Sequence, residues 1–83
     1  MGLEVFIDIE RNIRFSTCIR VHWFEYYRDG IVKDGGYGTI VEIKETFFNP
    51  HTKTKQCTML VLCDDGKLRA FPNRDLDLLE ELE

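Results

Sequence analysis

Apolar and polar side chains alternate at every second position over much of this 83-residue chain. The segment 3–9 has the sequence LEVFIDI, and in 13–21 every second residue is Ile, Phe, Thr, Ile or Val. A period of two is typical of half-buried strands, because successive side chains of a strand point to opposite faces. The pattern predicts a strand over 3–9 and another over 13–21, whose first half could instead form a loop. Strand signals dominate the chain and predict an all-β fold.

Three more strand signals follow in the second half of the chain. The β-branched segment 37–48 predicts a strand with one buried face, ended by Pro50. The segment 56–63, QCTMLVLC, is nearly all apolar, which predicts a strand buried on both faces. The Asp-Asp-Gly sequence at 64–66 predicts a tight hairpin of type I′ geometry, with a short returning strand over 67–71.

The remaining segments predict turns and loops. Residues 22–36, HWFEYYRDGIVKDGG, combine four aromatic residues with two glycine turns, which predicts a long ordered loop or an irregular hairpin. Residues 72–75 predict a single 3₁₀ turn, 76–79 a closing strand, and 80–83 an acidic, frayed end. Five to six short strands in so short a chain favour a small barrel over a sandwich.

Three strings in this order resemble the SH3-like small barrel: IRVHW, then GYGTIVEI, then TMLVLCDDGKLRAF followed by a turn and DLDLLE. The glycine-led strand and the last hairpin are similar to those of KOW, Mind bomb and PsaE types of this fold. The resemblance covers residues 19–79, and it implies an SH3-like barrel of five to six short strands with one 3₁₀ turn near the C-terminus. Residues 1–83 would then form one domain, with 1–12 as an extra N-terminal strand.

Charge is distributed unevenly along the chain, which carries a formal net charge of −4. All 11 basic residues lie between Arg11 and Arg74 with seven acidic residues among them, so this body carries +4 between acidic ends. A mildly basic body could bind nucleic acid. The chain contains no cluster of four or more bases, so we favour the view that the acidic ends neutralise the body and keep it in solution.

No catalytic or metal-binding signature is present. The chain lacks the Gly-x-Ser-x-Gly, P-loop and GxGxxG motifs. Its three cysteines form no CxxC, and Cys57 and Cys63 lie in an apolar strand, where a free cysteine behaves as a small hydrophobe. On one strand these two thiols would be about 20 Å apart, too far to share a zinc ion. We therefore expect no enzymatic activity, no cofactor and no metal.

Cellular context follows from the same composition. The first residues form no apolar signal segment, and no apolar run is long enough to span a bilayer. The odd number of cysteines argues against a secreted disulfide scaffold. We expect a cytoplasmic protein with reduced thiols and no membrane contact.

The aromatic segment 22–37 is the best candidate binding site. It carries more aromatic side chains than a small barrel could bury, and Trp, Tyr and Arg are common anchors of protein interfaces. We expect a protein-binding module that acts as a small accessory subunit or as an inhibitor of a larger enzyme, as small phage proteins often do. The expected partner-binding residues are Trp23, Phe24, Tyr26, Tyr27, Arg28 and Tyr37.

Two alternatives stay open. The first is a KOW-like RNA- or DNA-binding module, in which aromatic residues stack on bases and dispersed basic residues contact phosphates. The basic residues would be Arg20, Arg28, Lys33, Arg69 and Arg74. The second concerns residues 3–9, which lie outside the barrel resemblance and could pair with another copy of the chain through an exposed edge.

Overall fold

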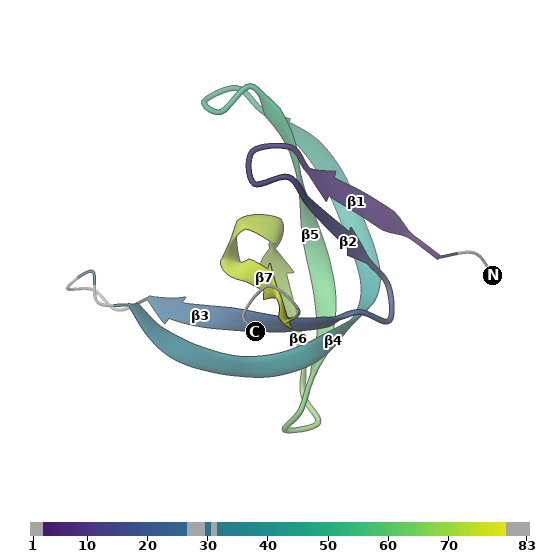
Figure 1. The fold of residues 1–83 in the computed structure, drawn as a ribbon, viewed down its shortest axis with the longest axis vertical. Coiled ribbons are helices and arrows are strands. Elements are labelled where there is room, and N and C mark those ends of the chain that lie inside the picture. Colours follow the sequence, from purple (N-terminus) through teal and green to yellow (C-terminus); the bar gives the residue numbers. More distant parts are fainter. Residues whose placement is uncertain (1–2, 27–29, 31, 80–83) are drawn as a thin grey trace.

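The computed structural model describes residues 3–26, 30 and 32–79. The described residues form seven strands and one 3₁₀ turn, with no α-helix among them (Figure 1). The all-β prediction is confirmed. The elements are β1 (Val5–Asp8), β2 (Ile13–Ser16), β3 (Arg20–Tyr26), β4 (Val32–Asn49), β5 (Thr54–Cys63), β6 (Leu68–Pro72), η1 (Asn73–Asp75) and β7 (Leu76–Leu78).

The strands form two sheets. Strands β1 and β2 make a separate antiparallel hairpin. The other five form an antiparallel sheet in the order β6-β5-β4-β3-β7, so β6 and β7 lie at its edges. The long strands of this sheet curve around the short β7 and η1, and the β1–β2 hairpin lies across β5 (Figure 1).

Strand β4 is the longest element, with 18 residues, and it is bent. Its pairing with β5 shifts register between Ile40 and Glu42 and again between Lys44 and Phe47. Such bulges bend a strand and increase its twist. At Gly38 a Cβ atom would lie 2.5 Å from Val61 Cγ1, so glycine is required where the two strands approach most closely. The bulges and this glycine let one strand serve both halves of the sheet.

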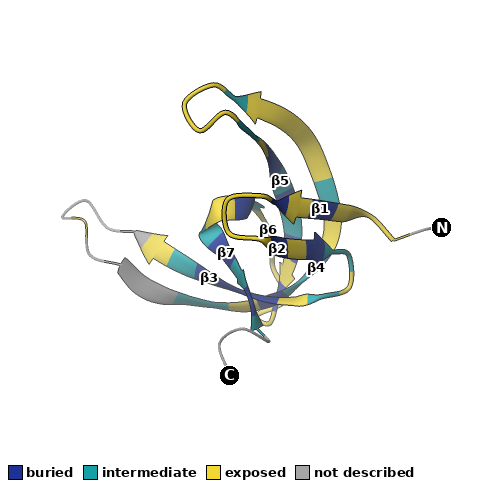
Figure 2. Ribbon diagram, turned by 45° about the horizontal axis from the view of Figure 1, so that its top comes forward, coloured by how far each residue is buried: buried dark blue, intermediate teal, exposed yellow. Residues whose placement is uncertain are grey.

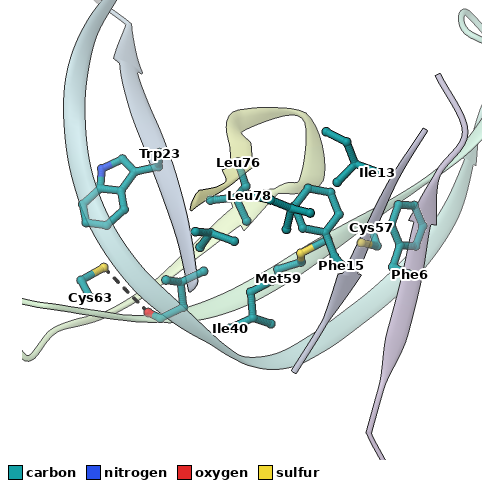
Figure 3. Packing of buried hydrophobic residues seen from close by; sticks show 12 residues of the cluster. Phe6, Ile13, Phe15, Trp23, Ile40, Cys57, Met59, Cys63, Leu76 and Leu78 are labelled. Carbon is teal, nitrogen blue, oxygen red and sulfur yellow. Dashed lines mark hydrogen bonds between the residues drawn. The ribbon is translucent and has the colours of Figure 1, made fainter. Parts of the chain in front are cut away.

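Side chains from both sheets build a single core (Figure 3). Phe15 from the hairpin and Ile40 and Met59 from the larger sheet are fully buried. Burying each such side chain contributes about 1.5–3 kcal/mol to folding. The core residues are Phe6, Ile13, Phe15, Val21, Trp23, Ile40, Cys57, Met59, Val61, Cys63, Leu76 and Leu78.

The described residues form seven strands, whereas the alternation predicts five to six. The expected strand over 13–21 is interrupted by a turn at residues 17–19, so it forms β2 and the start of β3. Cys18 lies in this turn with a φ of 70°, and its N–H donates to the carbonyl of Ile40 at 2.7 Å. The alternation of apolar and polar residues gives no sign of a positive φ at a non-glycine residue, because the backbone conformation does not change the polarity of the side chains. The prediction that every strand is short was also wrong. Strand β4 has 18 residues, because it begins at Val32, before the predicted segment 37–48.

Strand β1 buries the face opposite to the one that carries Val5 and Ile7. Phe6 and Asp8 are buried, whereas Val5 and Ile7 are exposed. Asp8 tolerates burial because Arg11 donates to its carboxylate at 2.9–3.0 Å and Asn73 Nδ2 donates at 3.0 Å. A buried charge is stable only when it is paired and hydrogen-bonded, and these partners meet that condition.

Asn73 fastens the hairpin to the larger sheet. It is fully buried, and besides donating to Asp8 it accepts a hydrogen bond from the Cys57 N–H at its Oδ1. The Asn73 carbonyl also accepts from Arg11 Nη2 at 2.8 Å. The predicted 3₁₀ turn is confirmed, and its first residue links β1, β5 and the β1–β2 turn. The closing strand is confirmed as β7, which pairs with β3.

The β5–β6 region differs from expectation in two ways. Strand β5 is not buried on both faces along its length, since Met59 and Val61 are buried while, on the other face, Leu60 is half-buried and Leu62 is exposed. The turn is a three-residue loop, because the Cys63 N–H donates to the Lys67 carbonyl and the Gly66 N–H donates to the Cys63 carbonyl. Only Gly66 of this loop has a positive φ, 88°, whereas a type I′ turn needs two such residues. The expected type I′ geometry was therefore wrong.

Candidate functional site

The aromatic segment 22–36 is not a long loop. Its described part belongs to an irregular hairpin of β3 and β4, with a register shift between Trp23 and Phe24. The irregular-hairpin alternative is therefore the one observed. Tyr27 and Arg28 lie outside the described residues, as do the side chains of Tyr26 and Lys33.

Trp23 is a core residue, with 6% of its surface exposed. Its indole stacks on Phe71, with ring centroids 5.2 Å apart and planes inclined by 29°. A Cβ atom at Gly35 would lie 2.2 Å from the indole, and one at Gly36 would lie 2.8 Å from it. The two glycines therefore let the indole lie against the β4 backbone. Together, Phe71 and the backbone at these glycines leave little of the Trp23 ring in contact with solvent.

Three rings gather on the opposite face of the same hairpin. His22 and Phe24 meet edge to face with centroids 4.6 Å apart, and His22 and Tyr37 are 4.9 Å apart. His22 is buried and Phe24 is half-buried. Tyr37 keeps 45% of its surface exposed, which makes it the most accessible of these three rings.

A groove of about 250 Å³ opens beside Tyr37. Part of its wall is the edge of Trp23 and the adjoining glycines, and its rim is the β5–β6 turn. The lining residues are Trp23, Gly35, Gly36, Tyr37, Asp64 and Asp65. The groove thus combines one exposed aromatic side chain, bare backbone and an acidic rim.

The acidic rim is paired with arginines. Arg20 donates to both carboxylate oxygens of Asp64, at 2.6 and 2.8 Å. This hydrogen bonding is the main cause that lowers the pKa of Asp64 below its usual value. Arg69 lies 3.6 Å from Asp65. The rim therefore offers two ion pairs rather than a net negative charge.

The basic residues expected to contact phosphates are not brought together. Arg20 and Arg69 are held by the two aspartates of the β5–β6 turn. Arg74 lies elsewhere, in the wall of a cavity of about 150 Å³ that it shares with Asp8 and Arg11. The described part of the chain therefore presents no continuous stripe of free arginines beside the aromatic hairpin.

The groove contains features that the sequence interpretation missed. Gly35 and Gly36 had been interpreted only as turn residues, and Asp64 and Asp65 only as hairpin residues. A tryptophan followed by a glycine pair about a dozen residues later was a usable signal, because glycines in a sheet often lie under an aromatic ring. The contribution of the β5–β6 turn had no local signal, since it comes from a distant segment.

The cysteines differ strongly in environment, and all three are free. Cys18 is exposed. Burial is the main cause that raises the pKa of Cys57 to about 12, with a smaller contribution from the Asp8 charge. Burial also raises the pKa of Cys63. Thiols with raised pKa values stay protonated at neutral pH and are poor nucleophiles.

Among residues 3–26, 30 and 32–79, no three His, Cys, Asp or Glu side chains are grouped so that they could hold a metal ion. Within the same residues, no helix has the length and apolar character needed to cross a membrane. Comparisons of this chain with family models, curated proteins and solved structures gave no match.

Proposed function

We propose that this chain is a non-enzymatic protein-binding module with an SH3-like small-barrel fold. Four consecutive antiparallel strands, then a 3₁₀ turn, then a short strand that returns to the first of the four support the fold assignment. In the SH3-like fold, strands follow each other in this order. Small β folds of this kind serve many functions, so the functional proposal depends on the site rather than the fold.

The groove beside Tyr37 is the observation that carries the functional proposal. Its size suits a single side chain of a partner rather than a whole small molecule, since ligand pockets commonly measure about 300–1,000 Å³. An apolar side chain would contact Tyr37 and the half-buried Gly35–Gly36 backbone. The Arg20–Asp64 pair would form a polar rim, as is usual around the buried centre of an interface.

The proposal keeps the expected biological role. The protein would act as a small accessory subunit or as an inhibitor that blocks a larger enzyme, in the manner of small phage proteins. The three free cysteines support a reducing, cytoplasmic location. Trp23 would contribute indirectly, by shaping the groove wall from within the core.

Affinity capture with two matched variants tests the proposal. Tyr37→Ser removes the exposed ring from the groove, and Phe48→Ser removes a ring that is even more accessible, 61% exposed, from the far half of β4. We expect wild type and Phe48→Ser to retain the same partner from a lysate of the source cells, and Tyr37→Ser to lose it. Circular dichroism must show that both variants remain folded.

Two outcomes would contradict the proposal. One is equal retention by wild type and Tyr37→Ser. The other is binding of RNA or DNA in a gel shift that weakens steeply as salt increases, because phosphate contacts release counterions. The second outcome would favour the KOW-like alternative.

A further inference from the structure

Strand β1 exposes an apolar row along a free edge. On the residues described, β1 pairs with β2 alone. Its outward face is exposed over most of its length (Figure 2). Four side chains in and beside the strand leave between 43% and 68% of their surface to solvent, namely Leu3, Val5, Ile7 and Ile9.

The backbone of β1 is oriented for further pairing. The Thr17 N–H donates to the Glu4 carbonyl, so the polar groups of Glu4 face β2. Backbone direction alternates along a strand, so the N–H and C=O groups of Val5 and Ile7 face away from β2. The exposed side chains and the free backbone groups therefore belong to the same residues. An edge of this kind is a template for pairing with another strand.

The two edge strands of the larger sheet are protected. Strand β7 has only three residues and includes Asp77, and β6 carries Arg69 and Pro72. Short length, charge and proline are the usual means of preventing edge pairing. Strand β1 carries no charge and no proline on its outward face, and its inward Asp8 is already paired with Arg11.

We infer that β1 pairs antiparallel with β1 of a second copy of this chain, about a two-fold axis at Phe6. In this register Val5 lies opposite Ile7 of the partner and Leu3 lies opposite Ile9. Each Val5–Ile7 pair exchanges two backbone hydrogen bonds, because both residues direct their polar groups to the free edge. The inference concerns a surface separate from the groove and does not depend on the proposed function.

Self-complementarity selects the second copy as the occupant. A two-fold interface brings the same patch from both copies together, so the patch must match itself. Every cross-strand pair on the outward face of this register is apolar. On the β2 side the row is bordered by Arg14 and Ser16, which lie opposite Ile7 and Val5. The dimer would therefore have an apolar centre between two polar rims, as interfaces commonly do.

The register also accommodates the charges on the inner face. It places Glu4 opposite Asp8 of the partner, which would be unfavourable for two free carboxylates. In each copy Arg11 lies 2.9 Å from Asp8 and neutralises its charge, so the Glu4 side chain would lie opposite an ion pair rather than a free carboxylate. The inner hydrogen bonds of Asp8 therefore serve both the fold and the dimer.

Sedimentation equilibrium at several concentrations tests the inference. The patch is small, so we expect a mass close to 9.8 kDa at about 5 µM that approaches the dimer mass at about 500 µM. Ile7→Lys places a charge in the centre of the patch and should weaken the dimer at least about tenfold. The matched control, Leu68→Lys, alters a side chain of similar exposure on β6 and should leave the dimer unchanged.

Cross-linking tests the register. In a Cys18→Ser background, a mixture of Val5→Cys and Ile7→Cys chains should form a covalent dimer, since paired Cα atoms lie about 5.5 Å apart. Either variant alone should not, because its two cysteines would be offset by two residues along the strands, about 6.8 Å. Circular dichroism should be unchanged in all variants, since these side chains are exposed.

Four results would overturn the inference. The first is a constant monomer mass at every concentration. The second is a dimer that persists in Ile7→Lys or is lost in Leu68→Lys, which would place the interface elsewhere. The third is failure of the mixed cysteine variants to cross-link. The fourth is a monomer whose β1 edge binds a strand from a different protein, which would replace the second copy as occupant.

Discussion

Replacement of Asn73 by leucine tests how the β1–β2 hairpin is held to the larger sheet. Leucine has a similar volume but no polar atoms. Asn73→Leu would leave the Cys57 N–H without its acceptor, 3.1 Å away. It would also remove one donor, 3.0 Å away, from the Asp8 carboxylate, which keeps its hydrogen bonds from Arg11. A buried group left unpaired costs about 1–3 kcal/mol, and a hydrogen bond to a charged group contributes about 1.5–3 kcal/mol.

The expected loss of stability is therefore about 2.5–6 kcal/mol. A chain of this length has a free energy of unfolding of roughly 4–12 kcal/mol, so the variant should be close to unfolded or clearly weakened. Urea denaturation followed by circular dichroism measures the difference. Asp77→Asn is a matched control, because it removes a half-exposed partner of the same Arg11, and it should cost less than about 1 kcal/mol.

A second variant gives a pH signature of the same network. Asn73→Asp keeps an acceptor for the Cys57 N–H but places a second carboxylate beside Asp8. Repulsion between the two carboxylates raises the pKa of the introduced carboxyl in the folded state. The variant is therefore more stable at low pH, where this carboxyl is protonated, and loses stability as pH rises. The difference in free energy of unfolding between Asn73→Asp and wild type should narrow from pH 7 to pH 5. A cost below about 1 kcal/mol for Asn73→Leu, or a gap independent of pH for Asn73→Asp, would refute this reasoning.

Three further predictions follow from packing and titration. Gly38→Ala should cost about 1–3 kcal/mol in urea denaturation, because its Cβ would lie 2.5 Å from Val61, whereas Gly66→Asn, in open space, should be nearly neutral; equal costs would contradict the close approach. Because burial raises the pKa of Cys57, its thiol ionises at a lower pH in the unfolded chain than in the folded protein. The urea midpoint should therefore fall as pH rises from 9 towards about 12, and Cys57→Ala should lessen that fall. Iodoacetamide at neutral pH should modify Cys18 alone in the native protein and all three thiols in denaturant, and rapid native modification of Cys57 by mass spectrometry would contradict its burial.

The strand content was predictable because alternation is a local property. Segments 37–48 and 56–63 were placed correctly as parts of β4 and β5, and the end of β4 at Asn49 follows from Pro50. The 3₁₀ turn and closing strand were also predictable, because Pro72 cannot continue a ladder easily. Alternation could not show the break at Cys18, since a positive φ leaves the polarity pattern unchanged.

The orientation of β1 was not predictable from its own residues. A period of two shows that a strand has two different faces, but it does not show which one is buried. In the structure the face with Leu3, Val5, Ile7 and Ile9 is the exposed one. The partners that make burial of Asp8 favourable include Asn73, which is 65 residues away in the sequence. Only tertiary structure brings them together.

The candidate site shows the same division between local and distant information. The aromatic content of the segment 22–37 indicated this hairpin as a candidate, but it could not separate the buried Trp23 from the exposed Tyr37. That separation depends on Phe71, which stacks on the indole from β6, and on a glycine pair across the hairpin. Aromatic residues of one segment thus have opposite roles because distant strands cover one and not the other.

Site-specific photo-cross-linking tests the central proposal most directly. A photoreactive phenylalanine analogue is placed at Tyr37 in one sample and at Phe48 in another, since both positions are exposed. Irradiation in the presence of the captured partner should give a covalent adduct from Tyr37 and none from Phe48. An adduct from Phe48 alone would contradict the proposal that the partner binds in the groove beside Tyr37.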